Sequence, residues 1–101
     1  MNDAKTTVVM RASGRAGMSF GAALAALREG RPVRREGWNG KGMFLFYVGE
    51  NEWRLPDTSV EPGRILPLAA FIALRAADEK VVPWTPSQTD ILAWDWREVG
   101  A

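Results

Sequence analysis

The chain of 101 residues contains neither cysteine nor histidine. The absence of cysteine excludes disulfide bonds, thiolate metal sites and cysteine nucleophiles. The absence of histidine removes the commonest metal ligand and the commonest general base at neutral pH. Any enzymatic chemistry would have to depend on carboxylates or lysine. We therefore predict a protein that binds a ligand, with no catalytic residue, no metal site and no cofactor.

The chain also lacks an excess of charge of either sign, because it has 13 basic and 12 acidic residues and a net charge of +1. Proteins that bind duplex nucleic acid usually present a clearly basic surface, so the balance argues against such a partner. No apolar run approaches the ~20 residues that span a bilayer, and residues 1–17 lack the features of a secretory signal. We expect a cytoplasmic protein with no membrane partner, consisting of a flexible extension at 1–17 and one ligand-binding domain at 18–101.

Hydrophobic spacing predicts a small α+β domain. Ser19 is a favourable N-cap, and the apolar residues after it recur at helical spacing, which predicts a helix over 20–29. The later segments are predicted as strands at 33–35, 43–48, 68–74, 80–84 and 94–99, a hairpin partner at 53–55, a surface loop at 56–67 and a short helix at 88–93. Pro83 is expected at a strand end or a sheet edge. Short turns favour a small antiparallel β-sheet with an N-terminal helix and a short C-terminal helical segment.

The two longest predicted strands indicate assembly. The runs at 43–48 and 68–74 are apolar on both faces, unlike the alternation of a half-solvated antiparallel sheet. One short helix cannot cover both faces of such a sheet. A second copy of the chain is the simplest cover for the other face, which predicts a homo-oligomer. The alternative is that the 56–67 loop and the N-terminal extension fold over it.

A short motif before the strand at 43–48 has the composition of a ligand-binding loop. It consists of Trp38, Asn39, Gly40, Lys41 and Gly42. An indole offers a face for stacking, glycines let backbone N–H groups approach a phosphate, and a lysine supplies a positive charge for it. This combination suits a nucleotide-like molecule, and it includes no obvious nucleophile or base. The alternative is that Asn39-Gly40 forms an ordinary tight turn.

Two groups of motifs occur in a specific order along the chain. The first group comprises Met18–Leu24, Glu29-Gly30, Val33, Arg35 and Gly37–Leu45, and the second comprises Phe71–Leu74, Lys80–Trp84, Ser87–Ala93 and Asp95-Trp96. In this order, from residue 18 to about 99, they resemble the second family of Thoeris anti-defence proteins of phages and prophages. The combination of Trp-Asn-Gly-Lys-Gly with Pro-Trp-x-x-Ser-Gln-Thr-Asp makes the resemblance specific.

The resemblance implies a function. Thoeris is a bacterial defence in which a TIR-domain enzyme senses phage and makes a cyclic ADP-ribose isomer from NAD, and this signal activates a killing effector. A protein of the family is implied to be a sponge that withholds the signal in the infected host cell without cleaving it. The family also implies an α+β homotetramer with pockets between protomers. Because some members bind the cyclic dinucleotides of CBASS defence, these are a second candidate ligand.

By resemblance, the ligand contacts come from two segments. They comprise Trp38, Asn39, Gly40, Lys41, Gly42, Met43, Trp84, Ser87, Gln88, Thr89 and Asp90. Their chemistry is suitable, because each base stacked on an indole contributes about 1–3 kcal/mol and the neutral polar groups can recognise hydroxyls and base edges. The glycines and the lysine suit a pyrophosphate, and the start of the 88–93 helix favours a second anionic group. Asp90 can accept from ribose hydroxyls or an adenine amino group.

Some of these residues, and several of their neighbours, also fit more ordinary roles. Ser87 and Asp90 match a helix N-cap with a capping-box pattern. Trp94 and Trp96 are expected to fill the core, and the arginines at 34–35 are expected to be solvated strand charges.

Two other classes of function stay open. Asp90, Asp95 and Glu98 offer the carboxylates of a hydrolase, which would need two of them to flank one bond. A phage structural or host-interaction module would bind no small molecule.

Overall fold

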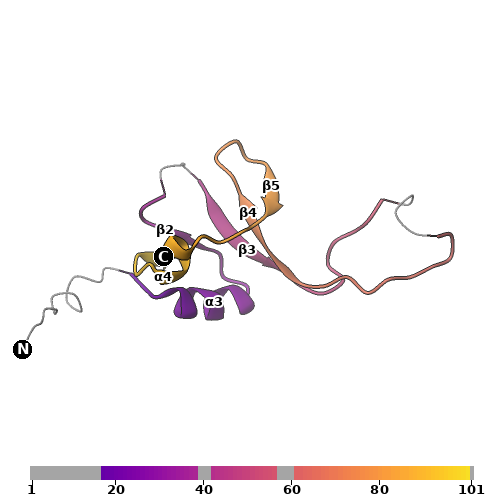
Figure 1. Ribbon diagram of the computed structural model, residues 1–101, viewed down its shortest axis with the longest axis horizontal. Coiled ribbons are helices and arrows are strands. Elements are labelled where there is room, and N and C mark those ends of the chain that lie inside the picture. The colour runs from indigo at the N-terminus through magenta and orange to yellow at the C-terminus, as the bar shows by residue number, and fades with distance from the viewer. Residues whose placement is uncertain (1–16, 39–41, 57–60, 101) are drawn as a thin grey trace, which may run out of the picture.

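The computed structural model describes residues 17–38, 42–56 and 61–100, which form a five-stranded antiparallel sheet and two helices (Figure 1). In chain order the elements are α3 (Phe20–Arg28), β2 (Val33–Arg35), β3 (Phe44–Val48), β4 (Phe71–Arg75), β5 (Val81–Pro83), α4 (Gln88–Leu92) and β6 (Trp96–Glu98). The strand order is β5-β4-β3-β2-β6, so β6, near the C-terminus, pairs with β2, which precedes it by about 60 residues. The predicted α+β class with an antiparallel sheet is confirmed.

The helix α3 forms where its caps and its apolar residues predict it. The Ser19 hydroxyl accepts a hydrogen bond from the Ala22 N–H at 3.2 Å, which satisfies one of the free donors of the first turn. Gly30, just past the C-terminal end, adopts a φ of 87°, a left-handed conformation that glycine tolerates without strain. Between these ends, Ala23, Ala26 and Leu27 are completely or almost completely buried against the sheet. Two of the three are alanines, so the helix backbone can approach the strands closely.

Strand register determines which side chains face α3. Val33 is paired with Leu45, and Arg35 is paired with Trp96. Residues directly opposite each other share a face, and residues two apart on one strand share it too, so these four side chains lie on the same side. Val33, Leu45 and Trp96 are fully buried there. We call this side the helix face of the sheet and the other side the open face.

The predicted hairpin between 43–48 and 53–55 is wrong. The partner of β3 is β4, with Leu45 opposite Leu74. Asn51 adopts a φ of 60°, and it exchanges two hydrogen bonds of 2.9 Å with the backbone of Leu68 through its own N–H and its side-chain oxygen. This pairing directs the chain outward beside the segment that returns to β4, so Trp53 does not fold back onto β3. Its indole N–H donates to the Ala69 carbonyl at 2.8 Å instead.

The hairpin of β4 and β5 is confirmed, and so is Pro83 as the last residue of an edge strand. The C-terminal strand is shorter than predicted, because it starts at Trp96. Trp94 therefore lies before the strand, where alternation does not apply, and it is 47% exposed whereas Trp96 is 0% exposed. The expectation that Trp94 fills the core is wrong, and the expectation for Trp96 is confirmed.

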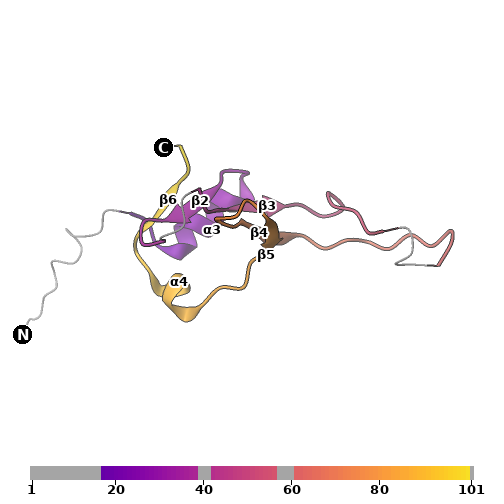
Figure 2. The same cartoon turned by 90° about the horizontal axis from the view of Figure 1, so that it is seen from above.

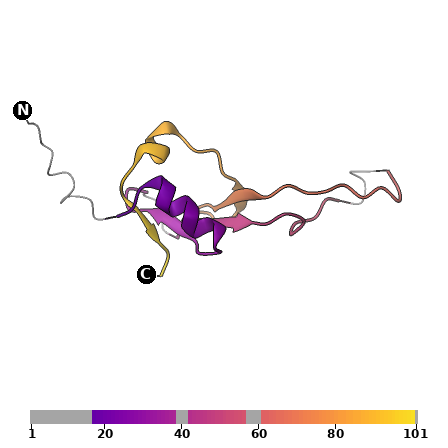
Figure 3. The same cartoon turned by 90° about the horizontal axis from the view of Figure 1, so that it is seen from below.

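Between β3 and β4 the chain projects away from the sheet, as all three views show (Figures 1, 2 and 3). We call residues 50–56 and 61–70 the arm. Its residues form no helix or strand, as predicted for a surface loop over the described part of 56–67. No helix in the described ranges is long and apolar enough to cross a membrane.

Candidate ligand-binding site

The buried indole of Trp96 organises the candidate site. Its ring centroid lies 5.4 Å from that of Trp38 and 5.9 Å from that of Trp84, both in edge-to-face geometry, and 5.4 Å from that of Phe20. Such aromatic pairs contribute about 0.5–1.5 kcal/mol each beyond the area they bury. The structure therefore brings together the two tryptophans that were predicted to stack on a ligand, although they lie far apart in the sequence. Both are only partly buried.

Backbone hydrogen bonds hold these two tryptophans at the ends of strands. The Trp38 N–H donates to the Arg35 carbonyl across the turn that follows β2. The Trp84 N–H donates to the Ile72 carbonyl at 2.9 Å, directly after β5. The Trp38 indole N–H also points to Oδ1 of Asp90, at 3.4 Å. Both rings are thus positioned by the protein itself, which lowers the ordering cost of binding.

The N-terminus of α4 forms a complete capping box. The Ser87 hydroxyl accepts from the Asp90 N–H at 3.0 Å, and Oδ2 of Asp90 accepts from the Ser87 N–H at 3.3 Å. The Asp90 carboxylate thus occupies the helix start, where the sequence predicted a second anionic group of the ligand. Gln88 and Thr89 remain exposed. The Asp90 carboxylate is therefore engaged within the protein, whereas the polar side chains of Gln88 and Thr89 stay accessible.

Arg35 is the residue that sequence reasoning missed. Its Nη1 donates to Oδ1 of Asp90 at 2.9 Å and its Nε donates to Oδ1 of Asp95 at 2.8 Å, and its side chain is only 16% exposed. The expectation of a solvated strand charge is wrong, because Arg35 shares the helix face with Val33 two residues earlier. That spacing was the signal that could have revealed it. Oδ2 of Asp95 in turn accepts from the Gly37 N–H at 2.8 Å, so the cluster ties the turn before Trp38 to α4 and to the segment before β6.

The electrostatics of this cluster favour the charged forms. Burial raises the pKa of Asp90, but the hydrogen bonds from Arg35, Ser87 and Trp38 outweigh it, and the net effect is a lowered pKa. The hydrogen bond from Arg35 lowers the pKa of Asp95, with further support from the Gly37 N–H against the opposing effect of burial. Bonding to the two carboxylates raises the pKa of Arg35 in spite of its burial. All three groups are therefore charged at neutral pH.

These lowered carboxyl pKa values predict that the folded chain loses stability at acidic pH. Because both carboxyl pKa values are lower in the folded chain than the ~3.9 of an unfolded aspartate, their contribution is complete above that value and is lost as the pH falls through the folded pKa values. We expect the urea midpoint to fall as the pH decreases below about 4. The fall should be shallower in Arg35→Gln, which lacks the main hydrogen-bond donor to both groups. Equal slopes for the two proteins would contradict the assigned role of Arg35.

The loop before β3 is only partly described. Asn39, Gly40 and Lys41 lie outside the described residues, so the phosphate cradle stays a prediction. Gly42 adopts a φ of 75°, and a Cβ there would lie 2.6 Å from Nη1 of Arg75. The same nitrogen donates to the Gly42 carbonyl at 2.7 Å. Arg75 thus anchors the end of the loop, next to the partly buried Met43.

The fold and the site define a small α+β domain that presents two prearranged tryptophans beside an exposed polar helix start. A family model described as the Thoeris anti-defense 2-like domain matches residues 18–99, and the chain belongs to this family. The chain is similar to Thoeris anti-defense 2 of Bacillus phage SP01, with 44% identity over 82 residues that cover 78% of this chain and 91% of the relative. The family assignment supports a function directed against Thoeris defence.

Proposed function

We propose that the protein is a sponge that binds a cyclic ADP-ribose isomer made by a Thoeris TIR enzyme and withholds it from the effector, in the cytoplasm of the infected bacterial cell. The observation that carries the proposal is the pair of partly buried tryptophans, Trp38 and Trp84, held on the same buried ring beside α4. Two flat surfaces in fixed positions suit a ligand that has a base and a cyclic ribose-phosphate frame.

The binding mode combines stacking with neutral hydrogen bonds. One indole stacks on the adenine and the other packs against a ribose, while Ser87, Gln88 and Thr89 bind hydroxyls and base edges. The segment from Asn39 to Gly42, with Lys41, receives the pyrophosphate. A sponge must compete with the effector at low signal concentration, so a nanomolar Kd, about −12 kcal/mol, is the natural target.

The pocket is proposed to be completed by assembly. One small subunit gives little enclosure, and the described helices leave the open face of the sheet uncovered. A homotetramer with pockets between protomers would enclose the ligand and cover that face. Cyclic dinucleotides of CBASS are proposed as a second ligand class, at separate sites.

The ligand is proposed to leave the site unchanged. A carboxylate hydrolase needs one acid with a raised pKa and a second carboxylate across the scissile bond. Asp90 and Asp95 are both bonded to Arg35, and the pKa of each is lowered. This arrangement argues against their use as a general acid, and it supports a non-enzymatic function.

The test is capture and release. The purified chain is incubated with cyclic ADP-ribose isomers, separated from free ligand by gel filtration, heated to unfold it, and the released small molecules are identified by mass spectrometry. We expect the bound isomer to return with unchanged mass and retention time. A converted product would instead indicate an enzyme.

A panel experiment addresses the remaining class of function. Calorimetry with the cyclic ADP-ribose isomers and with cyclic dinucleotides should give heat for at least one isomer, with a Kd in the nanomolar range. If a folded chain gives no heat with any ligand of the panel, the sponge hypothesis is overturned and a structural or host-interaction module is favoured.

A further inference from the structure

The arm presents apolar side chains to solvent. Ile65 is 92% exposed, and Leu55 and Leu66 are 37% and 39% exposed. All three lie on the part of the chain that projects from the sheet, beyond the Asn51–Leu68 pair that fixes its base (Figure 2). Apolar side chains grouped on a projecting segment are typical of an element that packs against another surface.

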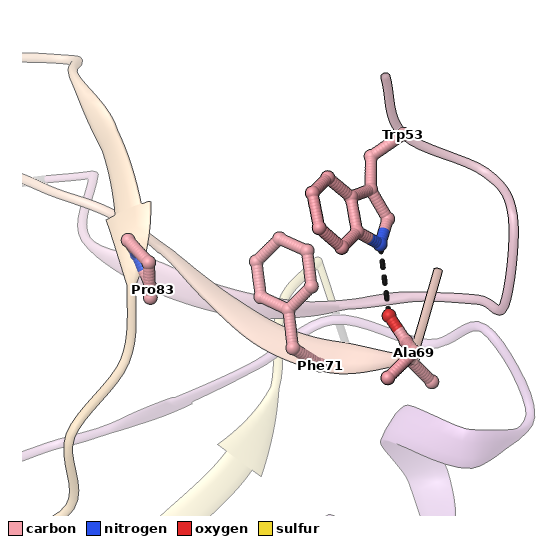
Figure 4. A pocket seen from close by; sticks show the side chains of 5 residues that line it. Trp53, Ala69, Phe71 and Pro83 are labelled. Carbon is pink, nitrogen blue, oxygen red and sulfur yellow. Dashed lines mark hydrogen bonds between the residues drawn. The ribbon is translucent and has the colours of Figure 1, made fainter. Parts of the chain in front are cut away.

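An apolar hollow lies at the base of the same arm. It has a volume of about 290 Å³ and is lined by Trp53, Ala69, Ala70, Phe71 and Pro83 (Figure 4). The ring of Trp53 stands edge-on to that of Phe71, with centroids 5.6 Å apart, and its N–H is satisfied by the Ala69 carbonyl. The volume is about ten times the ~30 Å³ share of one water molecule, so the hollow can accept a branched aliphatic side chain.

The hollow continues onto the open face of the sheet. Phe71 lies on the same face as Ala73, which is paired with Phe46 on one side and with Pro83 on the other. The ring of Phe46 contacts that of Phe44, with centroids 6.0 Å apart. The described helices pack on the helix face, so no helix covers this apolar surface within the described chain, and the guanidinium of Arg75 borders it on the same face.

We infer that the arm of a second copy covers this surface, with Ile65 and Leu66 seated in the hollow of its partner. The arm projects away from the sheet in every view, so its distal part does not cover the hollow of its own chain (Figures 1 and 3). A two-fold axis makes the contact reciprocal, with each copy giving one arm and receiving one. Arm, hollow and open face together provide about the 20–30 residues a side that a stable interface uses.

This inference rests on the homo-oligomer of the proposed function, and it specifies which contact makes it. Because the chain has no cysteine, single cysteines report on the contact directly. An isotope-labelled chain carrying Ile65→Cys is mixed with an unlabelled chain carrying Ala70→Cys, the subunits are exchanged in mild urea, and the mixture is oxidised. We expect a disulfide-linked mixed dimer, identified by its intermediate mass. The matched control replaces Ala70→Cys by Leu92→Cys, which is 71% exposed but lies on α4.

A second variant tests the energetic importance of the contact. Ile65→Asp should lower the mass measured by light scattering and leave the circular dichroism spectrum unchanged, whereas Leu92→Asp should leave both unchanged.

The outcomes separate the hypotheses. An oligomeric wild type that gives no more mixed dimer with Ala70→Cys than with Leu92→Cys overturns the arm contact and leaves the oligomer standing. A monomeric wild type overturns both. Binding of the cyclic ADP-ribose isomer is measured independently on the wild type.

Discussion

Replacement of Trp38 by alanine is expected to weaken binding of the cyclic ADP-ribose isomer by about 5- to 150-fold, the equivalent of one lost stacking contact of about 1–3 kcal/mol. The variant should keep the oligomer, because the Trp38 ring packs against Trp96 within its own chain and is not part of the arm. Calorimetry gives the Kd and light scattering gives the mass. Unchanged capture by Trp38→Ala would show that the site is assigned to the wrong surface.

Two further variants separate stacking from positioning. Trp38→Phe keeps a ring but loses the N–H that points to Asp90, so we expect a smaller loss of affinity than with alanine. Trp53→Ala removes an indole that contacts Phe71 at the base of the arm. Because Trp53 lines the hollow of the inferred contact, this variant can weaken binding only through loss of the oligomer, so the two affinities are compared at concentrations where light scattering gives the mass of the wild type. An equal loss of intrinsic affinity in both alanine variants would argue against a local role of Trp38.

Replacement of Trp96 by alanine is expected to cost about 3–5 kcal/mol of unfolding free energy, the usual effect of truncating a fully buried large aromatic side chain. This is a large fraction of the ~5–15 kcal/mol that stabilises a domain. Trp96 is 0% exposed, contacts the rings of Phe20, Trp38 and Trp84, and donates its indole N–H to the Asp90 carbonyl at 2.9 Å. Urea unfolding followed by circular dichroism measures the loss.

Trp94→Ala is the matched control for this stability prediction. Trp94 is 47% exposed and lies two residues away, so a much smaller loss is expected. Trp96→Phe should fall between the two, since it keeps an aromatic ring in the core but removes the shorter of the two hydrogen bonds to the Asp90 carbonyl, the other coming from the Ala93 N–H. Ligand binding by Trp96→Phe should weaken as well, because Trp38 and Trp84 share this ring as their support. Equal losses for both alanine variants would contradict the central place of Trp96.

Local patterns were sufficient for most of the elements. The N-cap and apolar spacing of α3, the hairpin of β4 and β5, and the edge position of Pro83 depend on neighbours within a few residues, and all are confirmed. The prediction of a hairpin partner at 53–55 was wrong, because Asn51 adopts a left-handed conformation that directs the chain outward. The hydrophobic pattern of the sequence does not indicate the direction of that turn. The predicted burial of Trp94 was wrong because the alternation of a strand was applied to a residue that precedes β6.

The candidate site was predictable as a list of residue types and not as an arrangement. Stacking rings, neutral polar groups and a glycine-rich loop are visible in the sequence, and the resemblance selected the two segments. The capping box was visible too, as a pattern of Ser87 and Asp90 three residues apart, and the structure contains it. The spacing of Arg35 from Val33 indicates its buried face, but its role was missed because its partners, Asp90 and Asp95, lie more than 50 residues away in the sequence.

The sequence by itself determined which side-chain chemistry this chain lacks. It also determined most of the helices and strands. Without cysteine and histidine there is no thiolate and no imidazole, and local hydrogen bonds and side-chain periodicity specify helices and strands wherever they lie. Only the tertiary structure decided that Trp38, Trp84 and Asp90 meet at Trp96. That meeting requires β6 to pair with β2 across more than half of the chain, and such long-range pairing is selected by packing of the whole core, which no local pattern contains.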